Sequence, residues 1–136
     1  MSSMPASTKK GGMALGLPDV CLTPAGPSPV PIPYPNIGQL DGCDGAVDKV
    51  LIENKESVVE DSKIPSSSGD EAGTIGGVVS GMNRGEVQFK TYSSKVYLKG
   101  KKAVYHTAVT AHNGTNANLP AGTQVAPSQT KVFVAR

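Results

Sequence analysis

The run LPDVCLTPAGPSPVPIPYPNIG, from Leu17 to Gly38, decides the fold because prolines occupy every second position in its second half. These prolines are Pro29, Pro31, Pro33 and Pro35. Successive backbone N–H groups of an extended chain point to opposite edges, so the prolines remove the donors from one edge. The residues between them, Val30, Ile32 and Tyr34, keep their N–H groups on the other edge. The sequence therefore predicts a stiff strand that pairs on one side only.

The composition around this run is typical of a turn-rich β domain. The chain has 136 residues, which is enough for one domain with a modest core. Its 16 glycines and 11 prolines predict many turns, and only 4% of its residues are aromatic. The charged fraction of 18% is too low for a disordered chain, and the apolar residues form short β-branched clusters. We expect a mostly β fold with little helix.

Charge and hydropathy exclude several classes of protein. The net charge of +2 is spread along the chain, which does not favour nucleic acid or an anionic membrane as a partner. No apolar stretch is long enough for a transmembrane helix, and residues 1–12 lack the apolar centre of a secretory signal. We therefore expect synthesis in the cytoplasm. Two cysteines are too few for a disulfide scaffold, although Cys21 and Cys43 could pair after export.

The remaining chain contains a loose internal repeat with the pattern Lys-Val-large apolar-apolar. Its copies are Lys49–Ile52, Lys95–Leu98 and Lys131–Val134. Asn54 and Gly100 follow the first two copies at positions typical of tight turns, so these copies predict hairpins, whereas the third meets the end of the chain. Three related strands predict an approximately threefold arrangement. We interpret residues 1–12 as a flexible leader and residues 13–136 as the domain.

Two further segments have clear local patterns. VQFKTY, at Val87–Tyr92, alternates apolar and polar residues as a half-exposed strand does. GTIGGVVSG, at Gly73–Gly81, is too rich in glycine for a stable helix and lacks the spacing of a phosphate-binding loop. We expect these glycines to allow close packing of the backbone.

The chemistry of the chain centres on His106 and His112, its two histidines, and on its cysteines. Imidazole nitrogen and thiolate sulfur are preferred zinc ligands, and a structural metal would stabilise a small core. The alternatives are solvated loop histidines, a buried Cys21 and a free Cys43 thiol. No nucleophile elbow surrounds Ser80 and no second acid–base group recurs nearby, so we do not expect an enzyme.

Five blocks, in order along the chain, resemble the Tox-PAAR-like branch of the PAAR superfamily. They are PDVC (Pro18–Cys21), PVPIPYPN (Pro29–Asn36), GDEAGTIGGVVSG (Gly69–Gly81), KVYLKGKKAVYHTAVTAHN (Lys95–Asn113) and APSQTKVFVA (Ala126–Ala135). Members of this superfamily form the tips of type VI secretion spikes and of related contractile injection systems. The resemblance implies a compact conical domain that caps a trimeric VgrG-type spike, with one copy per trimer.

The resemblance also implies a structural zinc near the point of the cone. Carried over by position, its ligands would be Cys21, His106 and His112, and the fourth ligand would be Cys43, Asp19, Asp70 or water. The cone would contact a target membrane only during puncture and would leave the cell with the secretion apparatus. An alternative function is a loading module that attaches an effector or toxin cargo to the spike.

Overall fold

A computed structural model describes residues 3–136, and short strands dominate it. The strands are β1 (Ser3–Pro5), β2 (Met13–Thr23), β3 (Val30–Gln39), β4 (Val47–Ile52), β5 (Lys55–Ser57), β6 (Lys63–Ile64), β7 (Gly76–Gly77), β8 (Val87–Phe89), β9 (Tyr97–Leu98), β10 (Lys101–Lys102), β11 (Val109–His112), β12 (Leu119–Ala126) and β13 (Phe133–Ala135). The one helical element among these residues is a 3-10 turn at Leu40–Gly42. No helix in the described part is long and apolar enough to cross a membrane. The expectation of a mostly β fold is confirmed.

The largest sheet has the order β3-β2-β12-β11-β8-β6, with antiparallel neighbours. Strand β2 is its longest member and pairs with β3 along one edge. On its other edge, β2 pairs with β12 near Met13 and with β7 near Cys21. Strand β8 lies within the predicted strand Val87–Tyr92, and its burial alternates as expected.

The proline-rich strand β3 lies at the edge of this sheet and pairs with β2 alone among the described strands, as predicted. The edge of β3 that lacks N–H donors at the prolines has a donor again at Ile37. Ile37 lies two residues after Pro35, so its N–H points to the same edge of the strand. The Ile37 N–H donates to the Ser68 carbonyl at 2.8 Å. The alternation of prolines thus determines both the free edge and the point where the loop around Ser68 attaches.

A bulge in β2 reverses which side chains face the interior. Ala14 and Gly16 are buried before the bulge, Leu17 and Pro18 are exposed within it, and Asp19 and Cys21 are buried after it. Because side chains alternate along a strand, one extra residue moves the following set to the opposite face. This bulge brings the Asp19 carboxyl and the Cys21 thiol into the interior.

The three repeats occupy three separate two-stranded sheets, β4-β5, β9-β10 and β1-β13. Their registers agree: Leu51 pairs with Glu56, Tyr97 with Lys102, and Phe133 with Pro5. The first two copies are hairpins whose turns hold Asn54 (φ 66) and Gly100 (φ 80) at positive φ, as predicted. The third copy completes its pair with the N-terminal strand.

A closed ring of backbone hydrogen bonds connects the three two-stranded sheets. The Ser7 N–H donates to Val104 (2.9 Å), the Val104 N–H to Val58 (3.1 Å), and the Val58 N–H to Ser7 (3.0 Å). Two residues further out, a second set connects the same three units in the opposite direction: Lys9 to Glu56, Glu60 to Lys102, and His106 to Pro5. The approximate threefold arrangement predicted from the repeats is therefore present in the backbone pairing.

Residues 3–12 of the expected leader pair with the rest of the domain or pack on it, and residues 1–2 lie outside the described part. Strand β1 pairs with β13, and Ala6, Ser7 and Thr8 are at most 1% exposed. The physical reason is topological: the third repeat needs a return strand, and the N-terminus supplies it. Small polar residues are suited to this position because they lie at the crowded centre of the ring.

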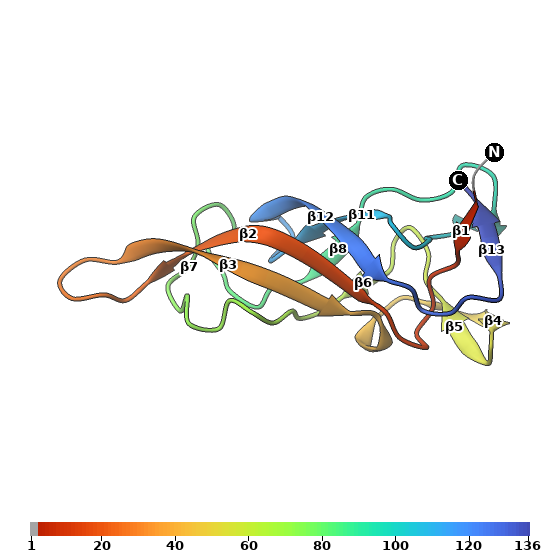
Figure 1. The fold of residues 1–136 in the computed structure, drawn as a ribbon, viewed down its shortest axis with the longest axis horizontal. Coiled ribbons are helices and arrows are strands. Elements are labelled where there is room, and N and C mark those ends of the chain that lie inside the picture. Colours follow the sequence, from red (N-terminus) through yellow and green to blue (C-terminus); the bar gives the residue numbers. More distant parts are fainter. Residues whose placement is uncertain (1–2) are drawn as a thin grey trace.

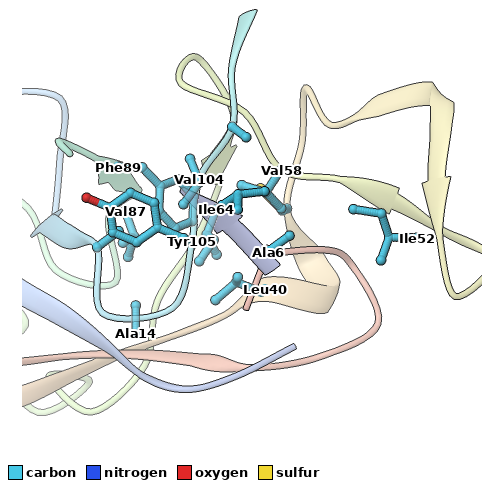
Figure 2. Close-up of a cluster of buried hydrophobic side chains, with 14 residues drawn as sticks. Ala6, Ala14, Leu40, Ile52, Val58, Ile64, Val87, Phe89, Val104 and Tyr105 are labelled. Atoms are coloured by element: carbon cyan, nitrogen blue, oxygen red, sulfur yellow. The ribbon is translucent and has the colours of Figure 1, made fainter. Parts of the chain in front are cut away.

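The molecule tapers from one end to the other (Figure 1). The wide end holds β1, β4, β5, β13 and the C-terminus, and the narrow end is the hairpin that joins β2 to β3. The apolar core includes Ala6, Leu40, Val58 and Val104, and Figure 2 shows these side chains gathered together. The wide end is thus held by apolar packing around the ring.

Candidate functional site

The structure places the three residues expected to bind zinc in two different regions. The His106 N–H donates to Pro5 of β1 at the wide end, whereas Cys21 pairs with Gly77 of β7 toward the narrow end (Figure 1). His112 lies six residues beyond His106, at the end of the extended strand β11. Six extended residues span up to about 20 Å, so closeness in sequence does not bring the two imidazoles together. His106 is not part of the cluster around Cys21.

Instead, two carboxyl groups lie beside the Cys21 thiol. One ligand atom from each of Asp19, Cys21 and Asp70 lies within 4.8 Å of the others, and all three residues are buried. Asp19 and Asp70 were among the expected fourth ligands. Cys43 belongs to the apolar core, and neither cysteine forms a disulfide. Asp19, Cys21 and Asp70 therefore form a candidate metal-binding triad by the number and type of their donors.

Three asparagine side chains direct their amide groups at the Asp19 carboxylate. Nδ2 of Asn118 and of Asn113 donates to Asp19 Oδ1 at 2.6 and 3.1 Å. Nδ2 of Asn36 donates to Asp19 Oδ2 at 3.1 Å and lies 3.3 Å from Asp70 Oδ2. Asp70 Oδ1 also accepts the Arg84 N–H at 2.9 Å. Both carboxyl groups are therefore satisfied without reaching water.

Burial and hydrogen bonding move the pKa values of the two carboxyl groups apart. Burial raises the pKa of Asp70 to about 7, and its hydrogen bond to Asp19 adds to this effect. Burial also acts to raise the pKa of Asp19, but hydrogen bonds from Asp70, Asn118, Asn113 and Asn36 outweigh it and hold that pKa below the usual range. Asp70 is accordingly the group of the pair that takes up a proton more readily, and Asp19 is the more acidic one.

His112 is a neutral member of the same network. Its Nδ1 lies 2.7 Å from Asn36 Oδ1, and its Nε2 lies 2.8 Å from Thr110 Oγ1. Because the Asn36 Nδ2 group already donates, Asn36 Oδ1 is the acceptor and His112 Nδ1 carries the hydrogen. Burial lowers the pKa of His112 to about 4, against the opposing charge of Asp19. Both ring nitrogens are occupied by hydrogen bonds.

The cysteines are neutral thiols. Burial raises the pKa of Cys21 to about 12, and the nearby Asp19 and Asp70 act in the same direction. The Cys21 Sγ lies 3.6 Å from Asp19 Oδ1 and accepts a contact from Asn113 Nδ2 at 3.6 Å. Burial likewise raises the pKa of Cys43 to about 12. Neither sulfur is a ready nucleophile.

Glycines of the segment Gly73–Gly81 pack directly on this network, as the sequence predicts. A Cβ on Gly73 would lie 2.4 Å from Cys21 Cβ, and a Cβ on Gly77 would lie 2.3 Å from Asn118 Cγ. Side chains at these positions would push the buried polar residues apart. The segment therefore serves as a flat cover over the network.

The wide end presents a second candidate site, formed by the same position of each repeat. Leu51, Tyr97 and Phe133 are 56%, 53% and 54% exposed. The next residue in each copy points inward: Ile52 and Val134 are buried in the core, and Leu98 packs against it. An exposed lysine lies two residues before each exposed apolar residue, at Lys49, Lys95 and Lys131. Three equivalent units thus each present one large apolar side chain and one lysine.

Sequence reasoning missed Asn36, Asn113 and Asn118. Asparagine is common in turns, so PYPN and HNGTNAN contain no signal that separates a buried amide from a turn residue. The sequence contains one weak indication that Asn36 faces inward. Asn36 lies two and four residues after Tyr34 and Ile32, so all three side chains face the same side of β3.

Comparisons with known proteins support the resemblance that the sequence shows. A family model described as "Toxin PAAR-like domain" matches residues 12–119. The DNase toxin Tse7 of Pseudomonas aeruginosa is 36% identical over 124 residues, which cover 86% of this chain. The chain spans about a third of that relative, since the match covers 32% of its length. No solved structure matches. The family match extends over the proline strand, the buried carboxyl pair and the first two repeats, and on this basis the chain belongs to the Toxin PAAR-like domain family.

Proposed function

We propose that this domain caps the end of a trimeric VgrG-type spike in a type VI secretion or related contractile injection system, with one copy per trimer. The observation that carries the proposal is the ring of Ser7, Val58 and Val104 with its three equivalent units. A single chain with approximate threefold symmetry can contact three identical subunits in the same way. Family membership supports the same partner.

The contact surface in this proposal is formed by Leu51, Tyr97 and Phe133, with the lysines that precede them. Burying each apolar side chain contributes roughly 1.5–3 kcal/mol. The lysines place positive charge beside these apolar side chains, although Lys131 also lies 4.0 Å from Glu53 Oε1. This charge would steer a partner end that carries acidic groups toward the surface. The exposed strands of the three units also offer edges for pairing with partner strands.

The narrow end is the mechanical point in this proposal. The proline strand loses little entropy on folding, and the buried polar network ties β2 and β3 to the loops around them. A rigid hairpin of this kind would meet a target membrane only during puncture. The protein would be made in the bacterial cytoplasm and would leave the cell with the spike. Zinc, implied by the resemblance, stays a prediction, and docking does not depend on it.

We further propose that the domain acts by binding and not by catalysis. His112 is fully buried with both ring nitrogens in hydrogen bonds, so it offers no free base. The Cys21 thiol is neutral and covered by Gly73. A nucleophile and a base with access to substrate are the minimum for hydrolysis, and these residues do not supply them.

The docking test is a set of matched substitutions. Leu51→Asp, Tyr97→Asp and Phe133→Asp should each weaken binding to the spike trimer by about ten- to hundredfold, and by similar factors, because the three side chains are equally exposed. Val78→Asp is the control, since Val78 is 53% exposed but follows β7 toward the narrow end. Titration calorimetry with the purified trimer measures the affinities. Equal binding by all four variants would refute the docking surface.

A second candidate is a loading module that attaches a toxin to the spike. The observation that favours it is the relative, a DNase toxin about three times as long as the matched region. In this case a reporter protein fused after Arg136 should be exported by a secreting strain, and the triple Asp variant should abolish that export. A domain that binds the trimer but leaves every fused reporter inside the cell would favour the tip function alone.

A further inference from the structure

We propose that a metal-free hydrogen-bonded clasp holds the narrow end together, in which the amides of Asn36, Asn113 and Asn118 grip the Asp19–Asp70 carboxyl pair at the place where the resemblance implies zinc. The clasp is these five residues. The inference does not rest on the proposed docking function, because it concerns only how the buried network is satisfied.

The orientation of each amide is determined by its hydrogen-bond partners. Asn118 Oδ1 accepts the N–H groups of Val79 (2.8 Å) and Ser80 (3.2 Å). Asn113 Oδ1 accepts the Gly85 N–H at 2.8 Å. These two Nδ2 groups therefore have to point toward the carboxyl pair. The Asn36 Nδ2 faces the acceptor oxygens of Asp19 and Asp70, which leaves its Oδ1, 2.7 Å from His112 Nδ1, as the acceptor of the ring N–H.

This orientation suits an anion and opposes a cation. A metal bound at Asp19 would lie against amide hydrogens that carry partial positive charge. Turning the amides over would offer oxygen to a metal, but the N–H groups of Val79, Ser80 and Gly85 would lose their acceptor. Each buried donor left unpaired costs about 1–3 kcal/mol. Zinc would have to displace the network that holds the site in shape.

The donor set also departs from what zinc prefers. Structural zinc sites use four nitrogen or sulfur ligands, whereas the triad offers one sulfur and two carboxyl groups. His112, the nearest imidazole in the network, is turned to Asn36 and Thr110. The residues around Cys21 therefore do not fit a structural zinc in the arrangement that they adopt.

The clasp joins the same kind of distant segments that a metal would join. Asp19 lies on β2 and Asn36 on β3, Asp70 lies in the loop before β7, and Asn113 and Asn118 flank the turn between β11 and β12. Asp19 contacts these residues across 17 to 99 positions of sequence. The Asp19 carboxylate thus links its own strand to three other segments, which makes a separate metal unnecessary for joining them.

Metal analysis of the native protein tests the clasp. Protein without an affinity tag, produced in zinc-supplemented medium, should contain far less than one zinc per chain by elemental mass spectrometry. Its melting temperature should be unchanged by a strong chelator or by added zinc. Stoichiometric zinc that survives dialysis, or a chelator-induced fall in melting temperature, would overturn the proposal.

Asn118→Asp separates the two explanations further. The new side chain still accepts the Val79 and Ser80 N–H groups, but it turns a carboxylate toward Asp19. The clasp predicts a lower melting temperature that zinc does not restore, whereas a metal site would gain a ligand and bind zinc more tightly. Asn54→Asp, in the exposed β4-β5 turn, is the control. Should Asn118→Asp fail to fold, the zinc content and chelator response of the native protein decide the question.

Cysteine substitutions supply a third readout. Cys21 lies beside the clasp and is a buried neutral thiol like Cys43. Cys21→Ser and Cys43→Ser should therefore lower the melting temperature by similar amounts and leave metal content unchanged. Selective loss of bound zinc in Cys21→Ser would contradict the clasp.

Discussion

Removal of residues 1–9 should destabilise the whole domain, although a sequence such as MSSMPASTK is typical of a dispensable leader. The deletion removes β1, which pairs with β13, and it opens the ring at Ser7. Five backbone hydrogen bonds outside the strand ladder are lost: those from Ala6 to Val132, Ser7 to Val104, Val58 to Ser7, Lys9 to Glu56 and His106 to Pro5.

At a net value of about 1 kcal/mol for each hydrogen bond, these losses amount to about 5 kcal/mol before any apolar burial is counted. Domains of this size are stable by only about 5–15 kcal/mol. The deletion should therefore lower the melting temperature by roughly 20 °C or abolish cooperative unfolding. Thermal unfolding followed by circular dichroism measures the effect.

Two comparisons make this test specific. Lys10→Ala removes only an exposed ion pair to Glu53, so it should leave the melting temperature nearly unchanged. A synthetic peptide of residues 1–10 should bind the truncated chain and restore part of the transition. A truncated chain that melts within a few degrees of the full chain would refute the role assigned to the N-terminal strand.

The remaining predictions concern the buried network and the two cysteines. Burial lowers the pKa of His112 to about 4, below the 6.5 of the unfolded chain, so its contribution to stability should be lost as the pH falls from about 6.5 to 4. The raised pKa of Asp70, about 7, acts in the opposite direction and favours the folded state at low pH, so Asp70→Asn should steepen the loss on acidification in denaturant titrations. Gly77→Ala should destabilise the domain by about 1–3 kcal/mol because its Cβ would collide with Asn118, whereas Gly11→Ala, with nothing within 4 Å, should be tolerated in the same denaturant assay. Both cysteines should resist a thiol reagent in the folded protein and react on unfolding, and fast labelling of the native chain would contradict the burial of Cys21 and Cys43.

The fold could be predicted from sequence wherever a local pattern carried it. The alternating prolines determine the edge position of β3, and the Lys-Val repeats identify the three units with their turns. The return strand of the third unit could not be predicted, because Ser3–Pro5 has no strand pattern of its own and pairs only through contacts with the far end of the chain. Its partner strand, β13, lies some 130 residues away.

The candidate site was harder to predict than the fold. Cys21 and His112 do belong to one buried network, in which Asp19 and Asn36 lie between them. The bulge at Leu17 and Pro18 turns Asp19 inward, and only the paired register shows its effect. The placement of His106 at the wide end follows from the direction of the chain before β11, which sequence spacing does not reveal.

The central claim is that three equivalent units of one chain dock on three subunits of a spike. Native mass spectrometry of the domain mixed with the VgrG-type spike protein of the same bacterium tests this claim most directly. We predict a single species that contains three spike subunits and one copy of this chain, even when the domain is in excess. Three copies per trimer, or a free monomer beside an uncapped trimer at high concentration, would contradict it.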